Sequence, residues 1–185
     1  MQRLDPKSTA VIVVDVQERL AAVMPPEQLQ ELTRAIRILV EGARLLGAPL
    51  FVTEQYPKGL GTTLPELAEP LRSAGARRFE KNEFSACDSD EFAAALHESG
   101  ARAAVVLGME AHVCVYQTVR DLVSRGIEVH VPIDGVTSRR DDHRETGLRL
   151  CERAGAIRTT SESVVFDWLR RSGSDAFKQL SKLIR

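Results

Sequence analysis

The fold of this chain can be worked out from one stretch of its sequence, Ala103-Ala104-Val105-Val106-Leu107-Gly108-Met109-Glu110-Ala111-His112-Val113-Cys114. The stretch opens with an apolar, β-branched run that has the length of a buried parallel strand, and the residues after Cys114 have helical spacing. Cys114 is therefore expected at or near a helix N-terminus, where free backbone N–H groups and the helix dipole lower the pKa of a thiol. Unpaired cysteines are usually small buried hydrophobic residues. Ligands of open α/β sheets, however, bind at the carboxyl ends of the strands, which makes Cys114 a candidate nucleophile.

The same alternation of strand and helix runs along the whole chain. Six apolar runs predict strands at residues 9–14, 49–53, 77–80, 103–107, 127–131 and 156–159. Segments of helical period lie between them, at residues 26–46, 89–99, 113–124 and 144–154. Such alternation specifies a parallel sheet with right-handed crossovers and helices on both faces. We therefore expect a three-layer α/β fold with a six-stranded parallel sheet.

The length of 185 residues fits a single domain, which we place at residues 1–185. Residues 56–65 form the longest irregular stretch, which either lines the site or is a solvated connection. The tail from residue 163 onward is predicted to be helical. It is longer than one domain needs, so we expect its C-terminal helix, at about residues 165–185, to pack on a neighbouring subunit of a homo-oligomer.

Composition and charge exclude several classes of partner. The 26 acidic and 25 basic residues nearly balance, so no overall field attracts nucleic acid or an anionic membrane. The sequence has neither an apolar stretch long enough to span a membrane nor the pattern of a signal peptide at residues 1–7. We expect a cytoplasmic protein that acts on a small-molecule substrate.

No metal or cofactor is expected. The 3 cysteines and 4 histidines lack the paired spacing of a zinc site. Neither a G-x-G-x-x-G nor a P-loop motif follows the first predicted strand, which argues against dinucleotide and nucleoside triphosphate binding.

Three polar residues lie at the carboxyl ends of predicted strands. Asp15 follows the first strand, Lys81 the third and Cys114 the fourth. Taken singly, Asp15 could cap the next segment and Lys81 could be a solvated lysine, but the ends of parallel strands meet at one edge of the sheet. There the carboxylate can take the thiol proton and later return it to a leaving group, while the ammonium stabilises the thiolate.

His112 is the rival base, because it precedes the thiol by two residues. A Cys–His pair needs the imidazole to reach the sulfur and a third group to orient the ring, and this spacing at a turn does not ensure either. We therefore expect His112 to line the pocket or to bind the backbone.

The motifs around these residues resemble a known superfamily. Asp15 lies in Val-Ile-Val-Val-Asp-Val-Gln, Lys81 in Phe-Glu-Lys-Asn-Glu-Phe-Ser-Ala and Cys114 in Gly-Met-Glu-Ala-His-Val-Cys-Val. Together they resemble the isochorismatase-like cysteine hydrolases, which include isochorismatase, nicotinamidase and N-carbamoylsarcosine amidohydrolase. The stretch Thr53-Glu54-Gln55-Tyr56-Pro57-Lys58-Gly59-Leu60-Gly61 and the tail motif Phe-Lys-x-Leu-x-x-Leu-Ile are most similar to the isochorismatase domain-containing subgroup.

This resemblance implies a sheet of strand order 3-2-1-4-5-6 and a triad in which Asp15 is the base, Lys81 the thiolate stabiliser and Cys114 the nucleophile. It also implies a cis peptide bond between Met109 and Glu110, with the backbone N–H groups of Glu110 and Cys114 forming an oxyanion hole. The substrate pocket that we expect is lined by Gln17, Gln55, Tyr56, Phe84, His112 and Tyr116.

The residues after the second predicted strand differ from those of the nicotinamidases in this superfamily, and the difference bears on which reaction is expected. Nicotinamidases carry an Asp and histidines after the second strand that bind a metal, whereas this chain has Glu54-Gln55-Tyr56 there. The resemblance then favours metal-independent hydrolysis of a C–N bond in an amide or ureide. The alternatives are isochorismatase-type vinyl-ether hydrolysis with Asp15 as general acid, and a non-catalytic scaffold or interaction protein.

Overall fold

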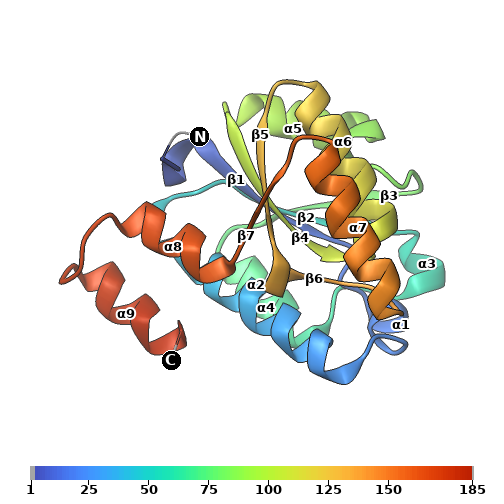
Figure 1. The fold of residues 1–185 in the computed structure, drawn as a ribbon, viewed down its shortest axis with the longest axis horizontal. Helices are drawn as coiled ribbons and strands as arrows, with labels where there is room; N and C mark the ends of the chain where they lie inside the picture. The colour runs from blue at the N-terminus through green and yellow to red at the C-terminus, as the bar shows by residue number, and fades with distance from the viewer. Residues whose placement is uncertain (1–2, 185) are drawn as a thin grey trace.

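The computed structural model describes residues 3–184, which form a three-layer α/β domain (Figure 1). The strands are β1 (Thr9–Val14), β2 (Leu50–Gln55), β3 (Arg77–Lys81), β4 (Ala103–Met109), β5 (Glu128–Pro132), β6 (Val136–Thr137) and β7 (Ile157–Thr159). All of their pairings are parallel.

The sheet has the order β3-β2-β1-β4-β5-β7, with β6 paired to β4. The predicted order 3-2-1-4-5-6 is confirmed, because the sixth predicted strand is β7. The predicted number of strands is wrong by one, since β6 had not been anticipated. Its two residues are too few to produce a periodic pattern, and they extend the sheet beside Gly108 and Met109 at the end of β4.

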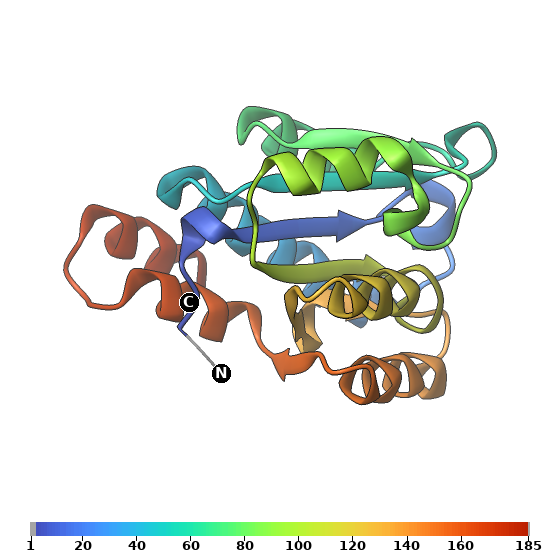
Figure 2. The same cartoon turned by 90° about the horizontal axis from the view of Figure 1, so that it is seen from above.

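Helices cover both faces of the sheet (Figure 2). One face carries α2 (Pro26–Leu46), α4 (Pro65–Ser73), α8 (Ser161–Leu169) and α9 (Asp175–Ile184). The other carries α5 (Asp90–Glu98), α6 (Tyr116–Ser124) and α7 (Asp141–Arg153). Two short helices, α1 (Glu18–Ala21) and α3 (Pro57–Leu60), follow β1 and β2.

The central strands β1 and β4 are buried on both faces, which explains their continuous apolar sequences. In β1, Val11 and Val13 pack into one core, and Ile12 and Val14 into the other. Both strands are buried along their whole length, and polar residues that are themselves buried follow their carboxyl ends, Asp15 after β1 and Glu110 after β4.

Several predicted boundaries shift in the structure. The helix predicted at 113–124 opens as a π-helical turn, Ala111–Val115, and becomes α-helical only at Tyr116. The helix predicted at 144–154 begins three residues earlier, at Asp141, and the irregular stretch 56–65 contains α3. Cys114 therefore lies within a π-helical turn, ahead of the first α-helical residue.

The tail forms two helices, α8 and α9, that pack against α2 of the same chain (Figure 1). Leu180 of α9 is fully buried, and Arg34 of α2 donates a hydrogen bond to the carbonyl of Ile184. The apolar side of α9 is thus partly covered within the chain, while Leu183 is 43% exposed, and packing of α9 on a neighbouring subunit stays a prediction. Among residues 3–184, no helix combines the length and apolar character needed to cross a membrane.

Candidate active site

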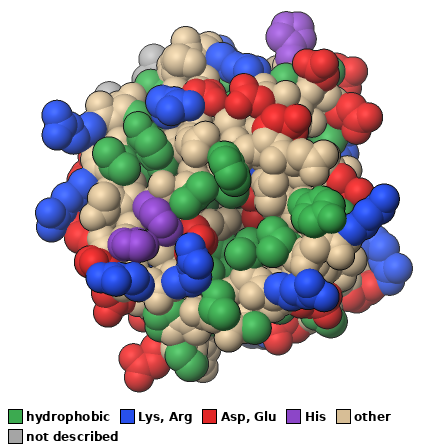
Figure 3. Space-filling view, turned by 90° about the vertical axis from the view of Figure 1, so that its right-hand side faces the viewer, with side chains coloured by type: hydrophobic (Ala, Val, Ile, Leu, Met, Phe, Trp, Pro, Cys, Tyr) green, Lys and Arg blue, Asp and Glu red, His purple; other side chains and the backbone are tan. Residues whose placement is uncertain are grey.

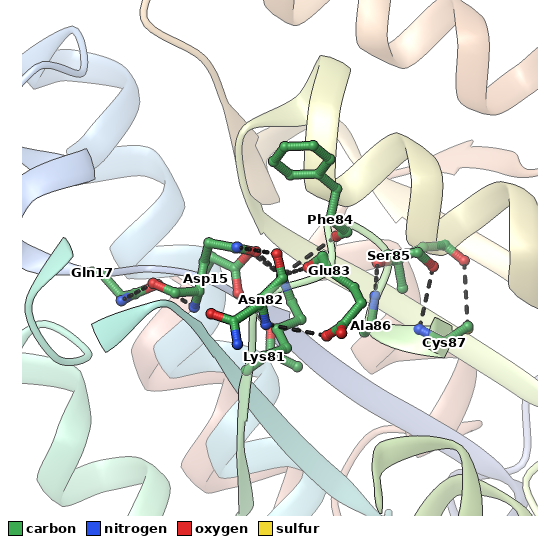
Figure 4. A network of polar contacts seen from close by, with 12 residues as sticks. Asp15, Gln17, Lys81, Asn82, Glu83, Phe84, Ser85, Ala86 and Cys87 are labelled. Atoms are coloured by element: carbon green, nitrogen blue, oxygen red, sulfur yellow. Dashed lines mark hydrogen bonds and ion pairs between the residues drawn. The ribbon is translucent and has the colours of Figure 1, made fainter. Parts of the chain in front are cut away.

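The carboxyl edge of the sheet brings Asp15 and Lys81 into direct contact. Lys81 ends β3 and Asp15 follows β1, and the Lys81 Nζ lies 2.7 Å from the Asp15 Oδ2 (Figure 4). Both side chains are 0% exposed. Asp15 has a φ of 52°, so the chain bends sharply at this residue as it leaves β1. A buried ion pair of this kind is costly to break, because either partner alone would be an uncompensated charge.

Thr53 of β2 occupies the other oxygen of the Asp15 carboxylate. Its hydroxyl donates to Asp15 Oδ1 at 2.7 Å, and its backbone carbonyl accepts the Asp15 N–H at 3.1 Å. Sequence reasoning missed this residue. The sequence offered one signal for it, a polar side chain in an otherwise apolar strand. That its partner is Asp15 depends on the strand register, which sets Thr53 opposite Val14.

The Lys81 ammonium has all of its hydrogens engaged by oxygen atoms. Besides Asp15, Nζ contacts Gln55 Oε1 at 2.8 Å and the carbonyl oxygens of Glu83 and Phe84 at 3.1 Å and 3.4 Å. An ammonium has three hydrogens, so none is left over for the sulfur of Cys114. Lys81 therefore acts on the thiol through its charge, which favours the thiolate.

The thiol of Cys114 is protonated at rest. Burial raises its pKa to about 12, with the charge of Asp15 and a hydrogen bond to Asp15 acting in the same direction and Lys81 opposing them. The expectation that a helix N-terminus lowers this pKa is wrong, because Cys114 is only 7% exposed and its thiol lies near the charge of Asp15. Asp15 is therefore placed to receive the thiol proton when a reaction begins.

The other two cysteines provide a comparison. Burial likewise raises the pKa of Cys87 to about 11 and that of Cys151 to about 12. A hydrogen bond to a carboxylate is among the causes that raise the pKa of Cys114, but it is not among the causes for Cys87 or Cys151. Both are expected to be inert.

The turn before Cys114 has the backbone geometry that the resemblance implied, with a cis peptide bond between Met109 and Glu110. The N–H of Ala111 donates to Ser138 Oγ at 3.1 Å. The Glu110 carboxylate is bound at 2.9 Å by Arg139 Nε. An oxyanion hole formed by the N–H groups of Glu110 and Cys114 stays a prediction.

His112 is hydrogen-bonded to Ser138, whose Oγ lies 3.1 Å from its Nδ1. Its ring centroid is 4.5 Å from that of His143, and Figure 3 shows two adjacent histidine side chains on this face of the molecule. Burial chiefly, with the neighbouring His143 and Arg139, lowers the pKa of His112. The imidazole is therefore neutral near pH 7 and is anchored on the loop after β6.

Gln17 and Gln55 tie together the loops around Lys81. Gln17 is fully buried, donates to the carbonyls of Gln55 and Gly61 at 3.0 Å and 2.6 Å, and accepts the Gln55 N–H at 2.7 Å. These bonds, with that from Thr62 N–H to Glu18 Oε2, hold residues 56–64 against α1. That this stretch lines the site stays a prediction.

Three aromatic residues complete the predicted pocket. Tyr56 and Phe84 are 54% and 55% exposed. Tyr116 is half-buried, with the Arg120 guanidinium 5.7 Å from its ring centroid. Contact of these residues with a substrate stays a prediction.

The carboxylate of Glu54 is bound by donors of the protein itself. Its buried carboxylate accepts bonds from Thr63 N–H at 2.8 Å, Thr63 Oγ1 at 2.7 Å and Arg78 Nη1 at 2.6 Å. Within residues 3–184, no group of three or more His, Cys, Asp or Glu side chains is arranged to hold a metal ion. Glu54 fixes the loop after α3.

Comparison with known proteins shows the family of this chain. The sequence-family model of the isochorismatase domain matches residues 9–163, which include Asp15, Lys81 and Cys114. The chain belongs to the isochorismatase family. Its relatives include the isochorismatase domain-containing proteins. Isochorismatase domain-containing protein 1 of Danio rerio is 36% identical over 183 residues, which cover 98% of this chain and 62% of that protein. The chain thus spans less than two thirds of the length of this relative.

Two further members of the isochorismatase family widen the comparison. The secreted isochorismatase effector Isc1 of Phytophthora sojae is 35% identical over 185 residues, covering 99% of this chain and 87% of that protein. A solved structure described as MAR1 ribonuclease from Caenorhabditis elegans is 39% identical, with a TM-score of 0.91, and covers 99% of this chain and 92% of that chain. Because one relative is secreted, the cytoplasmic location of this chain stays a prediction.

Proposed function

We propose that this protein is a metal-independent hydrolase that cleaves a C–N bond in a small amide or ureide through a thioester on Cys114. The observation that carries the proposal is the buried Asp15 carboxylate, which Lys81 and Thr53 hold in place and whose charge raises the pKa of the nearby Cys114 thiol. A substrate must be small to reach a sulfur whose residue is only 7% exposed.

In the first half of the reaction, Asp15 accepts the proton of Cys114 and the sulfur attacks the carbonyl carbon of the substrate. The negative charge that develops on the carbonyl oxygen is stabilised by the N–H groups of Glu110 and Cys114. When the C–N bond breaks, Asp15 returns the proton to the departing nitrogen, so that ammonia or an amine leaves as a neutral molecule.

In the second half, water attacks the thioester and Asp15 again takes a proton. The C–S bond breaks, the carboxylic or carbamic acid is released, and the proton returns to the sulfur. Lys81 stays charged throughout, and its field favours the thiolate at each step in which the sulfur carries negative charge.

The proposal is tested by offering the protein amides, ureides, isochorismate and RNA, and by searching for an acyl adduct with mass spectrometry. RNA is included because of the name of the C. elegans relative. We expect an amide or ureide to be hydrolysed and to leave an acyl group on Cys114, with none on Cys87 or Cys151. Cleavage of isochorismate or RNA without an adduct would contradict the thioester mechanism.

Gly147→Ala tests whether α7 fixes the position of the nucleophile. A methyl group on Gly147 would lie 2.5 Å from Ala111 C and 2.6 Å from His112 N, both backbone atoms of the turn that carries Cys114. We expect turnover to fall about 100-fold, the typical effect of a displacement of about 1 Å in an active site. Overpacking should also lower the free energy of unfolding by about 1–3 kcal/mol, measured with urea.

The matched control is Gly42→Ala in α2, where the new methyl group would meet side-chain atoms, the nearest being Trp168 Cζ3 at 3.2 Å. This variant should keep the turnover of the parent. Equal activities of the two variants would show that the close approach of α7 does not position Cys114.

A further inference from the structure

We propose that Thr53 is a positioning residue that keeps the shared proton on the Cys114 sulfur until substrate arrives, by donating a hydrogen bond to the Asp15 carboxylate. The inference rests on the proposed function, in which Asp15 is the base. It extends that function to a residue on β2 that belongs to none of the three motifs around Asp15, Lys81 and Cys114.

The geometry singles out Thr53 among the neighbours of Asp15. Its Oγ1 lies 2.7 Å from Asp15 Oδ1, and both residues are fully buried, so water does not replace this bond in the folded protein. The other carboxylate oxygen, Oδ2, is bound by Lys81 at 2.7 Å. A carboxylate has two oxygens with room for about four donors, so each oxygen retains a lone pair that can receive the thiol proton.

The Thr53 hydroxyl differs from the other neighbours of Asp15, because those neighbours are charged or can gain or lose a proton. Lys81 faces the carboxylate from β3 and Cys114 faces it from the π-helical turn, while Glu110 adds a weaker charge at the thiol. Thr53 from β2 is uncharged and donates its hydrogen bond whatever the pH. A hydrogen bond to a carboxylate favours the ionised form over the protonated one.

In the resting site, Cys114 and Asp15 share one proton, and its position defines two forms of the site. In the first form the sulfur is protonated and Asp15 is ionised, and in the second Asp15 is protonated and Cys114 is a thiolate. The Thr53 hydroxyl stabilises the first form more than the second. A hydrogen bond to a charged group is strong enough to change such an equilibrium by about tenfold or more. Thr53 thereby protects an otherwise reactive thiol in the absence of substrate.

The test uses iodoacetamide, which alkylates the thiolate, and the matched variants Thr53→Val and Thr53→Ser. Val has the shape of Thr but lacks the hydroxyl, and Ser retains it. We expect Thr53→Val to be alkylated at Cys114 about tenfold faster than the parent at pH 7.5, since more of its sulfur is ionised. The pH below which alkylation declines should also move upward, because the ionised carboxylate has lost a donor. Thr53→Ser should behave as the parent does.

Cys87 and Cys151 report on folding in the same experiment. Both are buried, so they should stay unmodified in every variant that retains the fold. If Thr53→Val does not fold, Thr53→Ala removes the same hydroxyl with a smaller side chain. Loss of fold would label all three cysteines, whereas the proposed effect labels Cys114 alone.

The inference is overturned if Thr53→Val and the parent are alkylated at the same rate and with the same pH profile, or if Thr53→Ser matches Thr53→Val. Failure of the proposed function would look different. In that case no amide or ureide forms an adduct on Cys114 of the parent, while the difference between the Val and Ser variants in iodoacetamide labelling persists.

Discussion

Cys114→Ala is expected to lower turnover of any amide or ureide substrate by about 10⁴-fold or more, because the variant has no atom that can form the thioester. The fold should survive. The substitution removes one sulfur atom from a turn that is also held by the Ala111 bond to Ser138. Turnover and the adduct mass are measured on the substrate found in the panel, and the melting temperature reports on folding.

Cys151→Ala is the matched control, since Cys151 is a buried cysteine of α7 whose thiol shares no hydrogen bond with Asp15 in the described contacts. It should keep the turnover of the parent. Full activity of Cys114→Ala on an amide would disprove the thioester mechanism. Hydrolysis of isochorismate by Cys114→Ala at the rate of the parent would instead establish vinyl-ether cleavage with Asp15 as general acid.

Asp15→Asn is expected to lower turnover by about 10²- to 10⁴-fold, the usual contribution of a general acid–base group. The amide of Asn has the size of the carboxylate but cannot take up the thiol proton or return it to the leaving nitrogen. It also leaves the Lys81 ammonium buried without its counter-charge, so the free energy of unfolding should fall by about 3–5 kcal/mol. Turnover, urea unfolding and the pH profile of iodoacetamide labelling together describe this variant.

The rate at which iodoacetamide alkylates Cys114 should depend on pH differently in the parent and in Asp15→Asn. In the parent, alkylation of Cys114 should be nearly independent of pH around neutrality, because the proton is shared with Asp15. In Asp15→Asn the rate should rise about tenfold per pH unit as the thiol itself titrates. The charge of Asp15 is among the causes that raise the pKa of Cys114, so this titration should occur below about pH 12.

Asp90→Asn, an exposed carboxylate in the first turn of α5, is the control and should leave all three measurements unchanged. If the labelling rates of Asp15→Asn and the parent depended on pH in the same way, Asp15 would not be the base.

The residues of the candidate triad could be chosen from the sequence because each lies at a position defined by local pattern. An apolar run that ends in Asp15 or precedes Cys114 indicates a buried strand with a polar residue at its carboxyl end. Parallel strands have these ends at one edge, so their convergence was predictable. The order of the strands came from the resemblance of the motifs to the isochorismatase-like hydrolases.

The state of the thiol was not predictable in the same way. Helical spacing after Cys114 indicated a helix N-terminus and hence a lowered pKa, whereas the π-helical turn places the sulfur in the interior beside a carboxylate. Burial depends on how α7 packs against this turn at Gly147, and no pattern within the turn itself records that packing.

What the sequence alone determined is the α/β fold and the identity of the candidate base, thiolate stabiliser and nucleophile. The tertiary structure decided how they are connected, through Thr53 on one oxygen of Asp15 and Lys81 on the other. These contacts join residues that are 38 and 66 positions apart along the chain. The physical reason is that periodicity reflects only the local conformation of the backbone and the side that each residue buries. Hydrogen bonds between strands depend on their register, which the packing of the whole sheet establishes.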